Sequence, residues 1–354
     1  KLKDFPEKER ALWRIFDQTP FEDGIAIERA SGDDILRFLD YPTYFDLLER
    51  PLPANREGIF EALRDDRIIR SSNAGGWDVM NLGAILFAKR LDAFHTLRRK
   101  SVRVIQYRGN GRTETLKEQE FNKGYASSFE ALISTINALL PANEVIGEAL
   151  RKSTPMFPEL AVRELVANAL IHQDFFVTGA GPTVEIFDDR IEITNPGEPL
   201  VDTQRFVDTP PRSRNETLAS LMRRFRICEE RGSGIDKVVF QVELFQLPAP
   251  LFESPEGFTR TVLFAHKALS AMDKADRVRA CYLHACLRFV TRQEMTNTSL
   301  RLRFGVEEQN RSTVSRLIRE AVEAGAIVPA DPGAAPKLMR YLPFWATGPK
   351  EGRA

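Results

Sequence analysis

The chain has 354 residues, of which 50 are Lys or Arg and 50 are Asp or Glu, so its formal net charge is zero. A neutral chain has no overall basic field, and any contact with nucleic acid must come from a local patch. Hydrophobic residues make up 43% and charged residues 28%, which is typical of a soluble globular protein with two or three domains at this length.

No run of apolar residues is long enough for a transmembrane helix, and no signal peptide is recognisable, so no membrane partner is expected. The chain begins at Lys1 and not at Met, which suggests that an N-terminal portion is missing. The three cysteines, Cys228, Cys281 and Cys286, are an odd and sparse set that fits the reducing cytoplasm. Cys281-x-x-His284-x-Cys286 could hold a metal, but it lies in an apolar helical stretch without a fourth ligand, so buried thiols are favoured.

The first part of the chain predicts two small units. Residues 1–50 read as an acidic-aromatic helical segment, and residues 51–124 as a small winged or hairpin-like connecting domain. Within the latter, strand 102–107 and the turn 108–112 form a hairpin that is rich in arginine. Its arginines are either solvated side chains, which is the favoured interpretation, or contacts to a phosphate backbone.

Residues 125–268 predict a larger α/β domain. A long helix is expected over residues 127–150, and a second helix follows from Pro158, a residue that suits the first turn of a helix. On this helix Glu164, Asn168 and His172 recur at intervals of four residues and therefore stand on one face, opposite an apolar back. A carboxylate can take a proton from an attacking water, and an amide oxygen suits Mg²⁺.

The remaining elements of this domain follow in order. Residues 183–187 and 190–194 alternate as two half-buried strands, the second of which ends at Asn195-Pro196-Gly197. Helices are expected over residues 215–226 and 234–247, and a closing strand over 260–264. Gly232-Ser233-Gly234 opens the second of these helices, where bare backbone N–H groups and the positive end of the helix dipole can meet a phosphate.

Residues 269–346 predict a winged helix-turn-helix, with helices over 276–289, 296–304 and 310–323 and a hairpin over 326–344, followed by a tail at 347–354. Residues 273–340 contain twelve basic and eight acidic residues, a local excess of 12 − 8 = +4. The third helix presents side chains that can bind phosphates or read bases of double-stranded DNA: Arg311, Ser312, Thr313, Ser315, Arg316 and Arg319. Winged helices also serve as dimerisation or protein-contact modules, so a homo-oligomer stays open as a partner.

In this order, the motifs around Glu164, Asn195 and Gly232 resemble the GHKL ATPase superfamily, which includes the ATP-binding domains of histidine kinases, MutL and gyrase-type proteins. The likeness is closer to its divergent branch, the RecG-like C-terminal ATP-binding domain of Schlafen/AlbA-type transcriptional regulators. The resemblance covers residues 125–268 well and implies a GHKL-like Bergerat α/β sandwich that binds ATP and Mg²⁺. No AlbA-like signature is found in the first 50 residues.

The resemblance also implies roles for particular residues. Glu164-x-x-x-Asn168-Ala169 matches the N box, in which Glu164 would be the general base and Asn168 the Mg²⁺ ligand. Residues 211–216 lie where a lid over the nucleotide would be. The implied nucleotide contacts are Asn168, His172, Asn195, Gly197, Arg214, Asn215, Gly232, Ser233 and Gly234.

One departure concerns the first glycine box, Asp-x-Gly-x-Gly, whose aspartate holds the adenine amino group. Here Asn195 stands in the place of the aspartate and only Gly197 remains. An amide oxygen can still accept a hydrogen bond, but without charge assistance.

Three functions stay open. The first is a regulator in which ATP binding repositions a DNA-binding winged helix. The second is an ATPase that acts on nucleic acid or gates an activity there, which Glu164 favours because a pure binding site needs no base. The third is an interaction scaffold with a relic nucleotide pocket.

Overall fold

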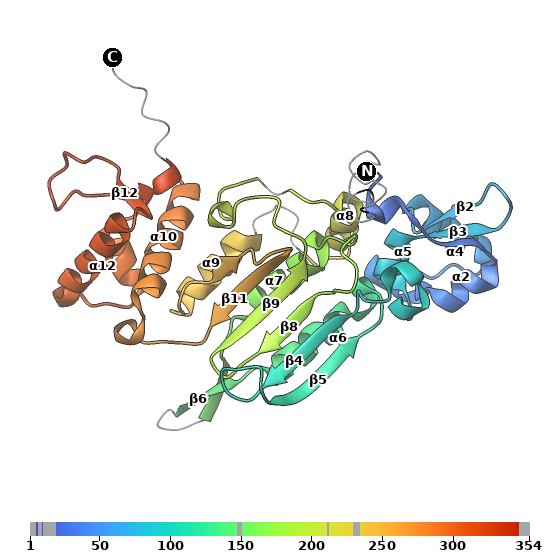
Figure 1. The fold of residues 1–354 in the computed structure, drawn as a ribbon, viewed down its shortest axis with the longest axis horizontal. Coiled ribbons are helices and arrows are strands. Elements are labelled where there is room, and N and C mark those ends of the chain that lie inside the picture. The colour runs from blue at the N-terminus through green and yellow to red at the C-terminus, as the bar shows by residue number, and fades with distance from the viewer. Residues whose placement is uncertain are drawn as a thin grey trace, which may run out of the picture.

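The computed structural model describes residues 5, 9, 19–146, 151–210, 212–228 and 234–346. They form three units along the long axis of the molecule, with a mixed β-sheet between an N-terminal and a C-terminal unit (Figure 1). The N-terminal and central units share one continuous hydrophobic core, and the C-terminal unit has a core of its own. The expected α+β class is confirmed; the predicted tail at 347–354 lies outside the described residues.

The N-terminal unit combines short helices with a three-stranded antiparallel sheet in the order β1-β3-β2. Ser31 caps the helix Gly32–Phe38 with a capping box, and Asn55 caps the helix Arg56–Asp65 by accepting from the amide of Gly58. The elements are β1 (Ile25–Ala30), α2 (Gly32–Phe38), α3 (Tyr41–Leu47), α4 (Arg56–Asp65), β2 (Ile69–Ser71), β3 (Trp77–Met80) and α5 (Asn81–Phe87).

This unit corrects the predicted division at residue 50. Strand β1 lies inside the segment expected to be purely helical, and it pairs with β3, where Ile25 faces Met80 and Ala30 faces Trp77. Residues on both sides of position 50 therefore build one sheet and one core. The strand escaped prediction because only its pairing partner, about 50 residues later, makes it a strand.

The central sheet has six strands in the order β10-β11-β9-β8-β4-β5, and of its pairs only β4 with β8 is parallel. Val184, Ile186, Ile191 and Ile193 are buried on the face that carries the helices. The strands are β4 (Val102–Tyr107), β5 (Thr115–Phe121), β8 (Thr183–Ile186), β9 (Arg190–Pro196), β10 (Leu251–Glu253) and β11 (Phe258–Phe264).

The hairpin of β4 and β5 thus belongs to this sheet, so the predicted boundary at residue 124 falls inside one layer. Its arginines are used in ion pairs: Arg103 with Glu118, Arg108 with Glu114, and Arg112 with Glu185 and Glu192. These pairs favour the structural interpretation of the hairpin over a phosphate contact.

Helices α6 (Tyr125–Leu139), α7 (Glu159–His172), α8 (Glu216–Arg224) and α9 (Gly234–Leu244) complete the central unit. The long helix predicted to reach residue 150 ends at Leu139. Pro141 forces its predecessor Leu140 into an extended conformation, which stops the helix. Beyond it, β6 (Ala142–Ile146) pairs with β7 (Arg151–Pro155).

The C-terminal unit has the predicted succession of elements. It consists of α10 (Lys274–Val290), α11 (Asn297–Arg303), α12 (Arg311–Glu323) and a two-stranded sheet of β12 (Ile327–Pro329) and β13 (Tyr341–Pro343). Thr296 caps α11 with a capping box, and Gly325 takes the positive φ of 69° that ends α12.

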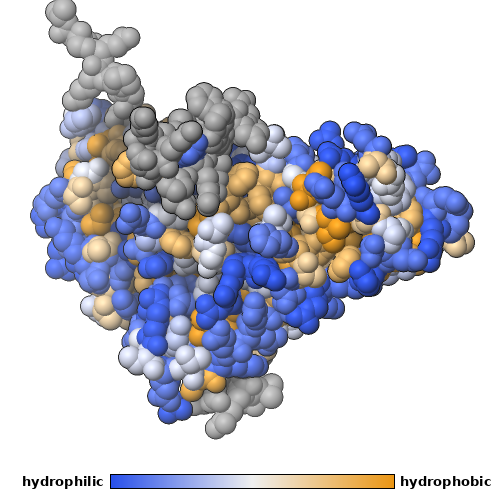
Figure 2. All heavy atoms as spheres, turned by 45° about the vertical axis from the view of Figure 1, so that its right-hand side comes forward, coloured by the Kyte–Doolittle hydropathy of each residue, from blue (hydrophilic) through white to orange (hydrophobic). Residues whose placement is uncertain are grey.

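On the face shown in Figure 2, polar residues cover most of the surface and apolar residues gather in smaller, separate areas. Within the described part of the chain, every helix is too short or too polar to cross a membrane.

Candidate functional site

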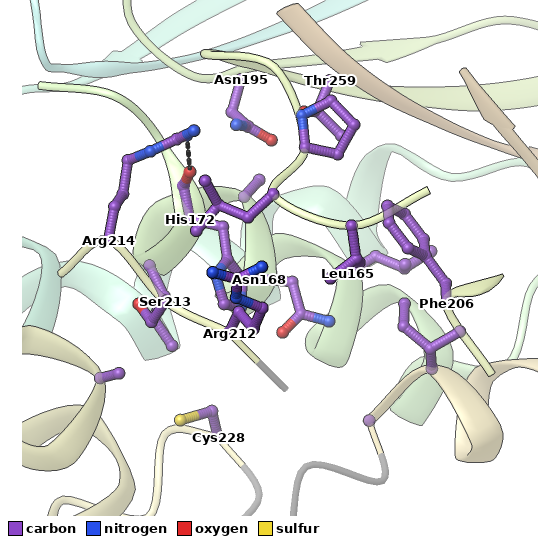
Figure 3. A pocket seen from close by; sticks show the side chains of 18 of the residues that line it. Leu165, Asn168, His172, Asn195, Phe206, Arg212, Ser213, Arg214, Cys228 and Thr259 are labelled. Carbon is purple, nitrogen blue, oxygen red and sulfur yellow. Dashed lines mark hydrogen bonds between the residues drawn. The ribbon is translucent and has the colours of Figure 1, made fainter. Parts of the chain in front are cut away.

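A cavity of about 550 Å³ lies between α7, the strands β9 and β11, the start of α9, and α8 with the segment that precedes it. We call this preceding segment, residues 197–210 and 212–215, the β9–α8 segment. Figure 3 shows the cavity with Asn195 and Thr259 at one end and Cys228 at the other, and with Asn168 between them. Its volume is in the range of small-molecule sites.

Helix α7 presents its predicted polar face to this cavity. Glu164, Asn168 and His172 all line it, as their four-residue spacing requires. Glu164 is buried, with only 4% of its surface exposed, whereas Asn168 and His172 are half-buried. The opposite face of α7, including Val162 and Val166, is buried in the core.

The first residue of α9, Gly234, lies against the Glu164 carboxylate. A Cβ atom at position 234 would approach Glu164 Oε2 to 2.6 Å, so only glycine fits without displacing the carboxylate. The N-terminus of a helix, with its free N–H groups, is therefore brought to the Glu164 end of the cavity. The other two members of this motif, Gly232 and Ser233, lie outside the described residues.

Asn195 lines the cavity from β9, whereas Gly197 does not. The Asn195 Nδ2 donates to the carbonyl of Pro196, and no hydrogen bond to its Oδ1 is recorded among the described residues. Gly197 has a φ of 101°, and a Cβ there would meet Arg214 Nη1 at 2.7 Å. Gly197 thus permits the close approach of Arg214.

Arg214 and Asn215 use their side chains to hold the backbone around the cavity. Arg214 lines the cavity, and its guanidinium donates to the carbonyls of His172 at 3.0 Å (Figure 3) and of Glu198 at 2.8 Å. The buried Asn215 side chain donates to the carbonyls of Ile171 and Gln173, both at 2.8 Å, and does not line the cavity. Both residues therefore satisfy orphan carbonyls at the end of α7.

Several further residues line the cavity that were not among the predicted contacts. They are Thr259 and Thr261 of β11, Arg212, Arg223 of α8, and Cys228. The two threonines face Asn195 and Ile193 across the strand pair, so they share the helix-covered face of the sheet. The alternation of side chains along β11 would predict that both threonines line the cavity, but only once the register of the strand pair is known.

The cavity carries positive charge that is not neutralised by ion pairs. Arg212 and Arg223 have no ion pair among the described residues, in contrast to most arginines of the central unit. Burial, together with the nearby Arg214, lowers the pKa of the His172 imidazole to about 4, so this ring is neutral at pH 7. A neutral imidazole with unpaired guanidinium groups suits an anionic ligand.

A second pair of charges lies beside the start of α9. Burial and the neighbouring carboxylate of Asp208 raise the pKa of Asp236 to about 6. Asp208 belongs to the β9–α8 segment and pairs with Arg205. The ionisation of Asp236 is thus coupled to the position of that segment.

The residues predicted to contact DNA lie on α12. Arg311, Ser312, Ser315, Arg316 and Arg319 are exposed, and Thr313 is half-buried. Ser315 Oγ accepts from Asn297 of α11 and donates to the Arg311 carbonyl. The three arginines have no ion pair among the described residues, while the apolar side of α12 with Val314, Leu317 and Ile318 fills the core of the unit.

The cysteines of α10 are buried, and burial raises the pKa of the Cys281 and Cys286 thiols to about 12. His284 between them bonds to Glu243 of α9 and to Ser299 of α11. Among the described residues, no cluster of three His, Cys, Asp or Glu could hold a metal ion.

Comparison with known proteins gives two results. Residues 179–263 match the family described as "Putative ATP-dependent DNA helicase recG C-terminal"; α7 precedes the matched residues. The crystal structure of the DIP2311 protein from Corynebacterium diphtheriae is similar over 94% of this chain and 67% of that chain, with 18% identity and a TM-score of 0.56, a likeness of fold alone. No curated protein matches the chain. The central part of this α/β chain is therefore similar to the ATPase-type C-terminal domain that this family describes.

Proposed function

We propose that the cavity binds ATP with Mg²⁺, and that the protein is a regulator in which this nucleotide site is coupled to DNA binding by the C-terminal unit. One observation carries the nucleotide site. Glu164 and Asn168 line the same cavity as Gly234, whose Cα stands against the Glu164 carboxylate at the start of α9. This brings a base, an amide oxygen and a helix N-terminus together, as a nucleotide phosphate requires.

The two ends of the cavity differ in their residues, and this difference orients the nucleotide in the proposed site. The phosphates lie at the Gly234 end, and the base lies at the Asn195 end, where the amide oxygen accepts a hydrogen bond from the adenine amino group. Thr259, opposite Asn195, and Thr261, opposite Ile193, offer further hydroxyl groups on β11 beside the base.

The donor set fits Mg²⁺. This ion keeps several waters and takes one or two protein oxygens together with phosphate oxygens, and the Asn168 amide can supply such an oxygen from the cavity face of α7. When bound, Mg²⁺ would neutralise part of the charge on the phosphates. Glu164 accepts a proton from a water that attacks the terminal phosphate.

The DNA-binding part of the proposal rests on α12. Five of its six candidate side chains are exposed, and its three arginines lack ion pairs within the described residues. The unit carries a local excess of four positive charges in a neutral chain. We assign α10 to α12 and the β12–β13 hairpin to a winged helix-turn-helix, with α12 as the helix that enters the major groove.

Isothermal titration of the full chain with ATP and Mg²⁺, together with a phosphate-release assay, tests the nucleotide site. Asn168→Ala is expected to abolish Mg²⁺-dependent ATP binding, whereas Glu164→Gln keeps binding and slows hydrolysis by roughly 10²-fold. Asn215→Ala, which weakens the end of α7 without removing a cavity residue, controls for general damage. Unchanged ATP affinity in Asn168→Ala would contradict the assignment of α7, and wild-type protein without phosphate release would leave binding as the function.

A further inference from the structure

A second, smaller cavity lies beside the first. The second cavity measures about 200 Å³ and shares three lining residues with the first: Glu164, Arg223 and Cys228. These three residues therefore lie where the two cavities adjoin. Arg223, on α8, is the positively charged residue of the three.

Arg223 differs from the arginines around it. Arg163 pairs with Glu130, Arg224 with Asp66, and Arg226 with Glu49. Arg223 is half-buried and has no ion pair or side-chain hydrogen bond among the described residues. A half-buried guanidinium has five donors to satisfy, so an unpaired one at a cavity wall calls for an anionic partner.

Contacts at both ends of helix α8 fix the position of the backbone that carries Arg223. The buried Glu22 accepts hydrogen bonds from the amides of Thr217 and Leu218 in its first turn, both at 2.8 Å. At its other end Arg224 pairs with Asp66 of the N-terminal unit. The backbone that carries Arg223 is thus fixed at both ends by the N-terminal unit.

We propose that Arg223 binds the terminal phosphate of a nucleoside triphosphate, beside Glu164. The proposal rests on the proposed function, because it requires the phosphates to lie at the Gly234 end of the cavity. The guanidinium donates to the oxygens of the γ-phosphate. Arg223 thereby makes the site prefer a triphosphate over a diphosphate, and the N-terminal unit sets that preference through α8.

The experiment compares the affinities of the full chain for ATP and for ADP by calorimetry. Arg223→Ala is expected to weaken ATP binding about tenfold or more, the usual effect of losing a hydrogen bond between charged groups, and to leave ADP binding unchanged. Arg226→Ala is the matched control: it removes the same charge from a neighbour that lines only the second cavity and already pairs with Glu49. This control is expected to change neither affinity.

A structural role for Arg223 would reduce both affinities together or lower the melting temperature without changing their ratio, and either result overturns the proposal. Arg223→Gln keeps most of the aliphatic stem and repeats the test if the alanine variant is unstable. If the wild type binds ATP and ADP and all variants keep its ATP-to-ADP ratio, only the role of Arg223 fails. If the wild type binds neither nucleotide, the proposed function fails with it.

Discussion

At the scale of single residues, the predicted site residues divide into two groups. Glu164, Asn168 and Gly234 meet at the cavity, while Gly197 and Asn215 build its frame. The sequence motifs assigned both groups to the nucleotide site. Only the contacts in the structure distinguish them, because a side-chain amide such as that of Asn215 uses the same donor and acceptor atoms to bind a ligand or to cap a helix.

Asp236 gives a prediction at this scale. The pKa of Asp236 is about 6 in the folded state and 3.8, the usual value, in the unfolded chain. Folding therefore disfavours the charged form of this carboxyl, and its ionisation lowers the free energy of unfolding. The penalty is absent below about pH 4, grows as the pH rises through 6, and is complete above it. Asp236→Asn should therefore stabilise the protein at pH 8 by about 1–2 kcal/mol and have little effect at pH 4.

Thermal unfolding of Asp236→Asn and wild type at both pH values measures this effect. Asp65→Asn is the control, since Asp65 is an exposed aspartate whose loss should not depend on pH in this way. A gain that is equal at pH 4 and pH 8 would mean that the burial of Asp236 and its proximity to Asp208 do not govern its ionisation.

At the scale of elements, periodicity located most helices and strands, and the exceptions have physical causes. The polar face of α7 and the apolar side of α12 follow directly from helical spacing. The early end of α6 was present in the sequence as Pro141, which restricts Leu140. The three-residue strand β10 is too short for a pattern, and β1 is a strand through its pairing with β3.

The proposed role of α12 leads to a second prediction. Replacing Arg316 and Arg319 by alanine should weaken duplex DNA binding and reduce the salt slope by about two, because each guanidinium neutralises one phosphate. A gel-shift titration at two salt concentrations measures it. Substituting Ser312 or Thr313 should instead change sequence preference, because these shorter side chains reach base edges.

The control for the arginine pair is a double alanine variant of Lys274 and Arg292. Both are exposed in the same unit but lie at the two ends of α10, so the net charge changes equally without touching α12. Equal DNA binding by the α12 variant and the wild type would assign α12 to dimerisation or domain docking.

At the scale of the whole molecule, each of the two outer units contacts an element that lines the cavity. The N-terminal unit anchors α8 through Glu22. The C-terminal unit contacts the β9–α8 segment: the Tyr282 hydroxyl donates to the Gln204 carbonyl and accepts from Trp345 Nε1, and Arg205 lies 4.4 Å from the Trp345 ring. A change of this segment on nucleotide binding would therefore reach the C-terminal unit directly.

This contact makes a third prediction. Tyr282→Phe removes the hydrogen bond to Gln204 and keeps the buried ring, so it should leave the separate affinities for ATP and DNA near wild type. It should reduce the effect of ATP on DNA affinity by roughly threefold, part of a coupling free energy that is typically 1–3 kcal/mol. DNA titrations with and without ATP measure this ratio.

Tyr341→Phe is the matched control, because among the described residues the Tyr341 hydroxyl makes no hydrogen bond, whereas its backbone bonds to Met295. Coupling that survives in Tyr282→Phe would show that the signal travels instead through α9, whose Glu243 bonds to His284 of α10.

The sequence by itself determined most of the elements and the polar face of α7, because helix and strand periodicities are local properties of the backbone. It placed Glu164, Asn168 and His172 in one line and foresaw the succession of helices and strands in the last unit. Only the tertiary structure decided that β4 and β5 join the central sheet, that β1 completes a unit across residue 50, and that Arg223 lines the same cavity as Glu164. Those outcomes depend on the pairing of strands and the docking of helices from distant parts of the chain; Glu22 and Leu218, for example, are 196 positions apart. Such contacts are fixed by burial and hydrogen bonding between partners that no local pattern identifies.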